Sequence, residues 1–124
     1  MAKQATSVAV SGTEATLIEI KDPRYLEKSQ VSVYLKFDTF AGGATEVKVR
    51  YYYSFDGGTT YYQVPVINAA TGAVTDLPDL VASGGPATIV RDIPVSASNA
   101  MKITGQTDSG TANLNTGTVM VRDN

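Results

Sequence analysis

The carboxylates are the side chains of this chain best suited to chemistry, because histidine and cysteine are both absent from the sequence. Without these residue types the sequence excludes imidazole acid–base catalysis, Ser-His-Asp and Cys-His nucleophiles, and most transition-metal sites. A glycoside hydrolase needs only a pair of carboxylates. The spacing of the aspartates predicts no such pair: Asp22, Asp38, Asp56, Asp76, Asp79, Asp92 and Asp108. We therefore expect that the chain is not an enzyme.

Short glycine-rich segments are the other places where a ligand could bind. Asp56-Gly57-Gly58 and Asp108-Ser109-Gly110 each offer oxygen atoms of the kind that calcium prefers, but neither has the ligand count of a calcium loop. Residues 83–86 lack the lysine and the following helix of a phosphate-binding loop. The sequence therefore predicts no metal and no cofactor.

Residues 54–61 read Ser-Phe-Asp-Gly-Gly-Thr-Thr-Tyr and resemble the Asp-box, Ser-x-Asp-x-Gly-x-Thr-Trp, with Tyr61 in place of the Trp. In such a turn the carboxylate accepts backbone N–H bonds, glycine adopts positive φ, and the terminal ring packs on the turn. Sialidase-like propellers carry the motif once per blade, away from the active site. Here it occurs once, in a chain of 124 residues that is too short for a propeller. The resemblance implies a stabilised turn and not a glycosidase.

Tyrosines cluster around this turn and form the main candidate for a binding surface. Aromatic faces beside hydrogen-bonding groups suit sugar rings, and exposed tyrosines also suit protein–protein contacts. In an extended chain Tyr51 and Tyr53 share the side of the neighbouring valines, so we expect them in the core. Tyr52 and Tyr61 are then the tyrosines expected to be exposed.

These tyrosines belong to a predicted β-hairpin over residues 45–66, which indicates the fold class. Val47, Val49 and the residues that follow alternate with polar side chains, as in a half-buried strand. Residues 56–59 form a tight turn, and residues 60–64 resume β-prone chemistry. Pro65 cannot donate a hydrogen bond to a neighbouring strand, so we expect an edge or a bulge there.

Several other segments have the alternation or composition of strands: residues 7–10, 14–21, 30–40, 88–95, 101–104 and 118–122. Within 14–21 the predicted faces separate Ile18 and Ile20 from Leu17. Residues 22–27 suit either a single helical turn or a loop, and residues 73–82 favour a short helical turn over a long strand. Residues 106–117 are predicted to be a long polar loop, a type that is usually functional or mobile.

Together these elements predict an all-β fold. We expect a single antiparallel β-sandwich domain over residues 1–124, Ig-like or jelly-roll-like, with about 7–8 strands and minimal helix. A small barrel is the nearest alternative. Residues 1–12 are either an extended arm or the first strand of the sandwich. The candidate interface residues are two tyrosines and three members of the polar loop: Tyr52, Tyr61, Asp108, Asn113 and Leu114.

The charge pattern argues against nucleic acid and membranes as partners. Ten Lys and Arg against twelve Asp and Glu give a net charge of −2, and the positive residues are scattered singly. Phosphate binding needs clustered cations, so we expect no nucleic-acid partner. Residues 1–6 lack the apolar run of a signal peptide, and no later segment is apolar enough to span a bilayer. We expect synthesis in a cytoplasm.

From Gln30 onward the chain resembles small virion proteins of tailed bacteriophages. The resemblance rests on the Tyr-rich strand with its Ser-x-Asp-Gly hairpin, on residues 93–95 and 101–105, and on the closing residues 116–121. It implies a structural β-sandwich of head decoration, fibre or tail type, located in the virion. It also implies binding to a capsid or tail lattice in many copies, as a homo-oligomer or multicopy assembly. The alternative is a carbohydrate-binding or receptor-binding module that uses the exposed tyrosines.

Overall fold

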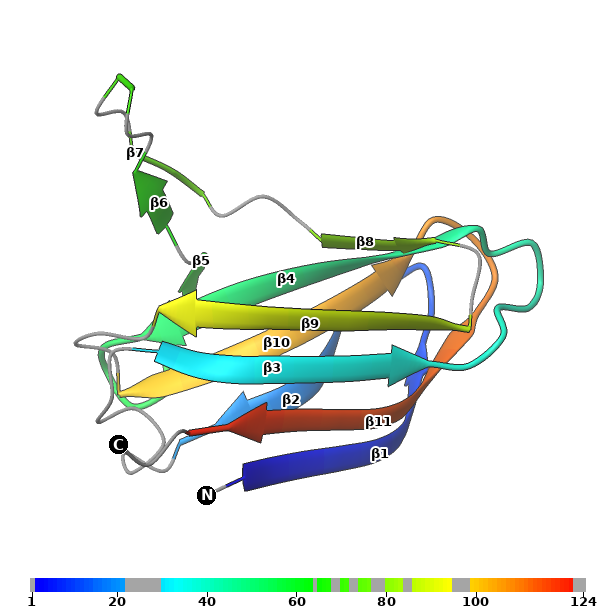
Figure 1. Cartoon of the computed structure of the whole chain (residues 1–124), viewed down its shortest axis with the longest axis horizontal. Coiled ribbons are helices and arrows are strands. Elements are labelled where there is room, and N and C mark those ends of the chain that lie inside the picture. The colour runs from blue at the N-terminus through cyan, green and yellow to red at the C-terminus, as the bar shows by residue number, and fades with distance from the viewer. Residues whose placement is uncertain are drawn as a thin grey trace.

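The computed structural model describes residues 2–21, 30–63, 65–67, 70–71, 74–76, 80–83, 86–94 and 99–121. Within these ranges the regular secondary structure consists of strands, and there is no helix. The strands form an antiparallel β-sandwich (Figure 1), which confirms the predicted fold class. In the described part of the chain no helix is long and apolar enough to cross a membrane.

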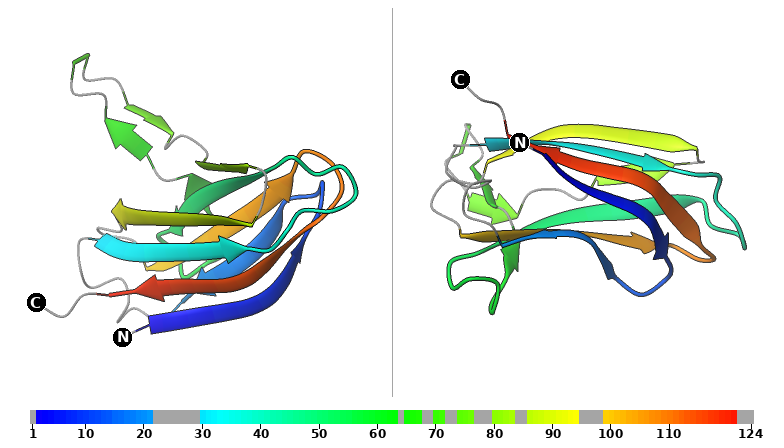
Figure 2. Two further views of the ribbon diagram at one scale, coloured as in Figure 1. Left: turned by 45° about the vertical axis from the view of Figure 1, so that its right-hand side comes forward. Right: turned by 90° about the horizontal axis from the view of Figure 1, so that it is seen from below.

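Two sheets make the sandwich, and they lie as separate layers in the right-hand view of Figure 2. The first, here called sheet A, has the order β1 (Ala2–Val10), β11 (Ala112–Met120), β3 (Gln30–Phe37), β9 (Ala87–Pro94). The second, sheet B, has the order β2 (Ala15–Ile20), β10 (Ala100–Thr107), β4 (Glu46–Ser54), β5 (Tyr62–Gln63). Strand β8 (Leu80–Ser83) also pairs with β4. Strands β6 (Pro65–Ile67) and β7 (Val74–Asp76) pair with each other and stand away from the sandwich (Figure 1).

The core lies between the sheets and is built from alternate residues, as the period-2 pattern predicts. On β3 and β4 the buried hydrophobic side chains are Val31, Val33, Leu35, Phe37, Val47, Val49, Tyr51 and Tyr53. The predictions that Tyr51 and Tyr53 belong to the core are therefore confirmed. Burial raises the pKa of Tyr51 to about 12. Phe55 continues the same parity but is exposed, because β4 ends at Ser54 and the chain turns there.

The prediction of a long polar loop over residues 106–117 is wrong. Strand β10 continues to Thr107 and β11 begins at Ala112, so only a tight turn separates them. The register of β11 on β3 jumps from Leu114 opposite Phe37 to Thr116 opposite Lys36, which leaves Asn115 as a bulge. The bulge moves the buried positions of β11 from even to odd residue numbers. The alternation is hard to recognise in the sequence, because many residues of this strand are small and polar.

Leu114 is fully buried, with 0% of its surface exposed, so its prediction as an interface residue is also wrong. It packs in the core as part of strand β11. The neighbouring strand β1 is irregular at the same level, because Ser7 has φ 54 and lies between the pairs Thr6 with Thr116 and Val8 with Leu114. Residues 2–10 pair with β11 on both sides of this kink.

Four further predictions have different outcomes. Leu17 and Ile18 are both buried although they are adjacent, because the register of β2 on β10 shifts between Ile103 and Thr104. Within residues 73–82, where a short helical turn was predicted, residues 74–76 and 80–82 belong to strands β7 and β8, and the remaining positions lie outside the described residues. Residues 22–27 lie outside the described residues. Pro65 begins β6, a strand of a two-stranded sheet, where an edge position is expected for proline.

Candidate interaction surfaces

The turn between β4 and β5 has the geometry that the Asp-box resemblance implies. Asp56 accepts hydrogen bonds at Oδ1 from Ser54 Oγ at 2.6 Å and from the amides of Thr59 and Thr60 at 3.2 and 2.9 Å. Gly58, with φ 96, supplies the positive φ. The hydrogen bond from Ser54, followed by that from the Thr60 amide, lowers the pKa of Asp56 to about 2. The prediction of a stabilised turn is confirmed.

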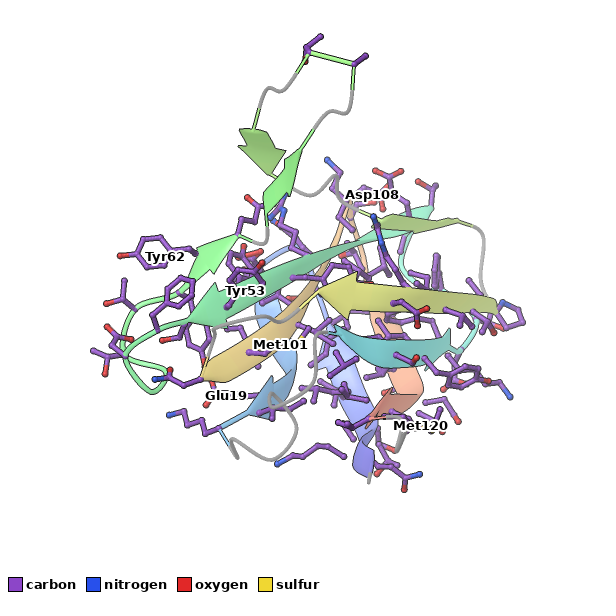
Figure 3. The ribbon with its side chains drawn as sticks, turned by 60° about the vertical axis from the view of Figure 1, so that its left-hand side comes forward. Glu19, Tyr53, Tyr62, Met101, Asp108 and Met120 are labelled. Carbon is purple, nitrogen blue, oxygen red and sulfur yellow. The ribbon has the colours of Figure 1, made fainter. Side chains whose placement is uncertain are left out.

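Asn99 fixes this turn to the beginning of β10. Its Oδ1 accepts a hydrogen bond from the amide of Gly57 at 2.8 Å, and its Nδ2 donates to the carbonyl of Phe55 at 3.1 Å. Phe55 and Tyr62 are 53% and 58% exposed, and their ring centroids are 6.3 Å apart. The turn therefore presents an exposed aromatic pair at one end of sheet B, where Figure 3 labels Tyr62.

The structure brings Tyr52 and Tyr61 together on the outer face of sheet B, with Lys102 against both rings. The ammonium nitrogen of Lys102 lies 4.5 Å from the ring centroid of Tyr61 and 5.2 Å from that of Tyr52. These are cation–π distances, so one face of each ring is occupied. Both tyrosines are half-buried. Sequence reasoning missed Lys102, although strand parity in residues 101–104 would have placed it on the outer face.

A hydrogen-bond network extends from Tyr52 along the same face. Glu14 Oε2 accepts from Tyr52 Oη at 2.9 Å, from Arg50 Nη1 at 3.0 Å and from Thr104 Oγ1 at 3.0 Å. Partial burial raises the pKa of the Glu14 carboxyl, but the hydrogen bonds from these donors outweigh it and leave the pKa below its usual value. Arg50 Nη1 also donates to Gln106 Oε1 at 3.3 Å, so the Arg50 side chain is held in place.

A polar pocket of about 330 Å³ lies at the end of this network, over β4 and β10. We call it the sheet B pocket. It is lined by Gly12, Glu46, Lys48, Arg50, Gln106, Thr107 and Asp108. Its lining combines two cationic and two anionic side chains, and Gln106 Nε2 donates to the carbonyl of Gly12 at 2.8 Å.

Asp108 and Asn113, both candidate interface residues, have partners within the domain. Asp108 Oδ1 accepts hydrogen bonds from the amides of Thr45 and Glu46 at 3.0 and 3.3 Å. The hydroxyl of Thr45, followed by its amide, holds the pKa of Asp108 well below its usual range. Asn113 Nδ2 donates to Asp38 Oδ2 at 2.7 Å. These contacts give both residues a structural role, and their part in an interface stays a prediction.

An apolar groove of about 360 Å³ lies on the outer face of sheet A and was missed by sequence reasoning. We call it the sheet A groove. Strand register places Gln4, Thr118, Tyr34 and Val90 in one row across all four strands, because each is paired with the next. Met120 and Ser32 pair in the adjacent row. Val90 and Met120 are 71% and 46% exposed.

The sheet A groove and the exposed aromatic pair lie on different sides of the molecule. Figure 3 shows Met120, which lines the groove, far from Tyr62 across the ribbon. The alternation of residues along the strands did not predict the groove, because outward-facing positions are expected to be polar.

Among the described residues, no group of three or more Asp, Glu, His or Cys side chains is arranged to hold a metal ion.

Comparison with known proteins gives structural likeness without a family. No protein-family model matches the sequence. No curated protein matches it either. Among solved structures, the SPBc2 prophage-derived protein YomS is similar with 11% identity and a TM-score of 0.45, over 96% of this chain and 94% of that one.

A chain in the structure of infectious bursal disease virus, Gt strain, is also similar. It has 18% identity and a TM-score of 0.46, over 96% of this chain. This chain spans 32% of the length of that one. Similarity at these levels does not transfer a function or a partner to this chain.

Proposed function

We propose that this chain is a structural protein of a virus particle that attaches in many copies to a capsid or tail lattice. The attachment surface is the sheet A groove. The observation that carries the proposal is the exposed apolar floor of this groove on the outer face of a sheet, where polar side chains would otherwise face water.

The surroundings of the groove suit a protein–protein interface. Register places Lys36 and Thr116 beside each other in the row next to Tyr34, and Ser32 donates a hydrogen bond of 2.6 Å to Asp92 on the other side. An apolar centre with a polar rim is the usual anatomy of such an interface. Tyr34 adds an aromatic side chain at the centre, a residue type enriched at binding hot spots.

Sheet A also offers a strand edge beside the groove. Strand β1 is the last strand on one side of the sheet, and Lys3 is its one charged residue. Strand β9, at the other edge, carries Arg91, Asp92 and Pro94, which discourage pairing with another chain. Strand addition at β1 is therefore available as a second contact with a lattice protein.

The resemblance of the sequence to small virion proteins of tailed bacteriophages supports the proposed structural role. The same role implies a location in the virion. The domain is built on packing and on turns closed by Asp56 and Asp108, so it needs no disulfide for stability. A rigid domain of this kind loses little conformational entropy when it docks repeatedly on a lattice.

Co-sedimentation tests the proposal. The oligomeric mass of the purified chain is measured by light scattering, and the same sample is then pelleted with virus particles from the same source. The proposal expects a defined species that pellets at a fixed and saturable ratio to the major lattice protein. A chain that stays in the supernatant at every concentration would contradict it.

A further inference from the structure

We infer that the sheet B pocket binds a neutral carbohydrate. This inference goes beyond the proposed function, and it concerns the opposite sheet of the sandwich from the sheet A groove. The pocket volume of about 330 Å³ falls at the lower end of the range for small-molecule sites, about 300–1,000 Å³. A site of this size suits a short stretch of an oligosaccharide.

The polarity of the pocket selects the class of ligand. Most small-molecule sites are predominantly apolar. Here the walls are side chains with donors, acceptors or both: Glu46, Lys48, Arg50, Gln106, Thr107 and Asp108. Sugar hydroxyls both donate and accept hydrogen bonds, so they suit a lining that contains donors and acceptors.

The charge of the lining argues against an ionic ligand. Lys48 and Arg50 would attract an anion, but Glu46 and Asp108 line the same pocket and would repel it. A cation would be attracted by Glu46 and Asp108 but repelled by Lys48 and Arg50. Because the two positive and two negative side chains balance, the pocket favours a neutral ligand with many polar groups.

The lining is also held in position before any ligand arrives. Arg50 is held by Glu14 at 3.0 Å and by Gln106 at 3.3 Å. Gln106 is held in turn by the carbonyl of Gly12, and both Arg50 and Gln106 project from paired strands of sheet B. Side chains fixed on strands lose little entropy on binding, so this part of the cost of association is small.

This site replaces the stacking platform predicted for Tyr52 and Tyr61. Lys102 lies against both rings, so a sugar could stack on those faces only if Lys102 moved. Tyr52 instead contributes indirectly, because its hydroxyl donates to the same Glu14 carboxylate that holds Arg50.

The test is an NMR titration of the intact, isotope-labelled chain with three neutral oligosaccharides: maltohexaose, cellohexaose and chitohexaose. Polygalacturonate fragments serve as the anionic control. The inference expects at least one neutral oligosaccharide to shift the amide signals of Lys48, Arg50 and Gln106 in a saturable manner. Absence of saturable shifts with all three neutral sugars, or stronger binding of the anionic fragments, would overturn it.

A matched pair of lysine variants tests the location of the site. Lys48→Ala removes a cation that lines the pocket, whereas Lys36→Ala removes an exposed lysine from sheet A. The loss of a hydrogen bond from a charged group is expected to weaken binding about tenfold in Lys48→Ala, with no change in Lys36→Ala. Equal weakening in both variants would overturn the inference. Lys48→Ala should pellet with particles as the parent chain does, so failure of this inference and failure of the proposed function are distinguishable.

Discussion

The amide of Thr45 donates a hydrogen bond of 3.0 Å to Oδ1 of Asp108, a residue 63 positions further along the chain. The hydroxyl of Thr45 donates to Oδ2 of the same carboxylate, and the amide of Glu46 donates to Oδ1 at 3.3 Å. One side chain in the turn after β10 therefore fixes the backbone that enters β4.

Asp108→Asn should lower the melting temperature by a few degrees, because the amide NH₂ cannot accept the hydrogen bond from the Thr45 hydroxyl. Thermal unfolding followed by circular dichroism measures the change. Asp92→Asn is the control, since an asparagine oxygen can still accept the hydrogen bond from Ser32. Equal melting temperatures for Asp108→Asn and the parent chain would show that the contact does not stabilise the fold.

Asp56 should make stability depend on pH at the acidic end. Its pKa in the folded chain is lowered from 3.8 to about 2, so its ionised form favours folding. The stabilisation is fully present above the unfolded pKa and is lost as the pH falls through about 2. The difference in melting temperature between the parent chain and Asp56→Asn should thus be largest above pH 5 and should narrow towards pH 2. A constant difference across this range would contradict the assignment.

Leu114→Ala should reduce the free energy of unfolding by about 2–5 kcal/mol, because it opens a cavity in the core. Val90→Ala, at an exposed position of β9, should change it by no more than about 0.5 kcal/mol. Urea denaturation of the two variants measures both values. A small effect at Leu114 would mean that the bulge at Asn115 is placed wrongly.

Gly110→Ala should be strongly destabilising, whereas Gly12→Ala should be nearly neutral. Gly110 has φ +63, and a Cβ there would lie 2.3 Å from the carbonyl oxygen of Ala41. At Gly12 nothing lies within 4 Å of the added atom. We expect a loss of more than about 1 kcal/mol at position 110 in urea denaturation. Similar stabilities for the two variants would be inconsistent with the close approach of these turns.

The fold was predictable where the alternation of hydrophobic and polar residues is regular. The prediction failed where a bulge interrupts this alternation. Residues 30–40 and 45–66 contain clear period-2 patterns and Asp-Gly turn chemistry, and the structure has strands β3, β4 and β5 there. Around Leu17 and Asn115 the register shifts, so adjacent or out-of-phase residues face the core. Strand parity read from one chain cannot place such shifts, because they depend on the neighbouring strand.

The candidate surfaces were predictable only in part. Tyr52 and Tyr61 were identified by type and parity, but Lys102 lies against both rings and reaches them from another strand. The sheet A groove depends on the register of four strands, which brings Tyr34, Val90 and Met120 near one another. Such cross-strand neighbours are set by pairing over long sequence separations, and composition does not show them.

The most direct test of the attachment surface is co-sedimentation of Val90→Asp/Met120→Asp with virus particles. Both side chains are exposed, so the charges should leave the fold intact, while they place two carboxylates in the sheet A groove. Phe55→Asp is the control, because Phe55 is 53% exposed, between Val90 and Met120, but lies outside the groove. The account predicts that the double variant stays in the supernatant while Phe55→Asp pellets as the parent chain does. Undiminished pelleting of the folded double variant would contradict it.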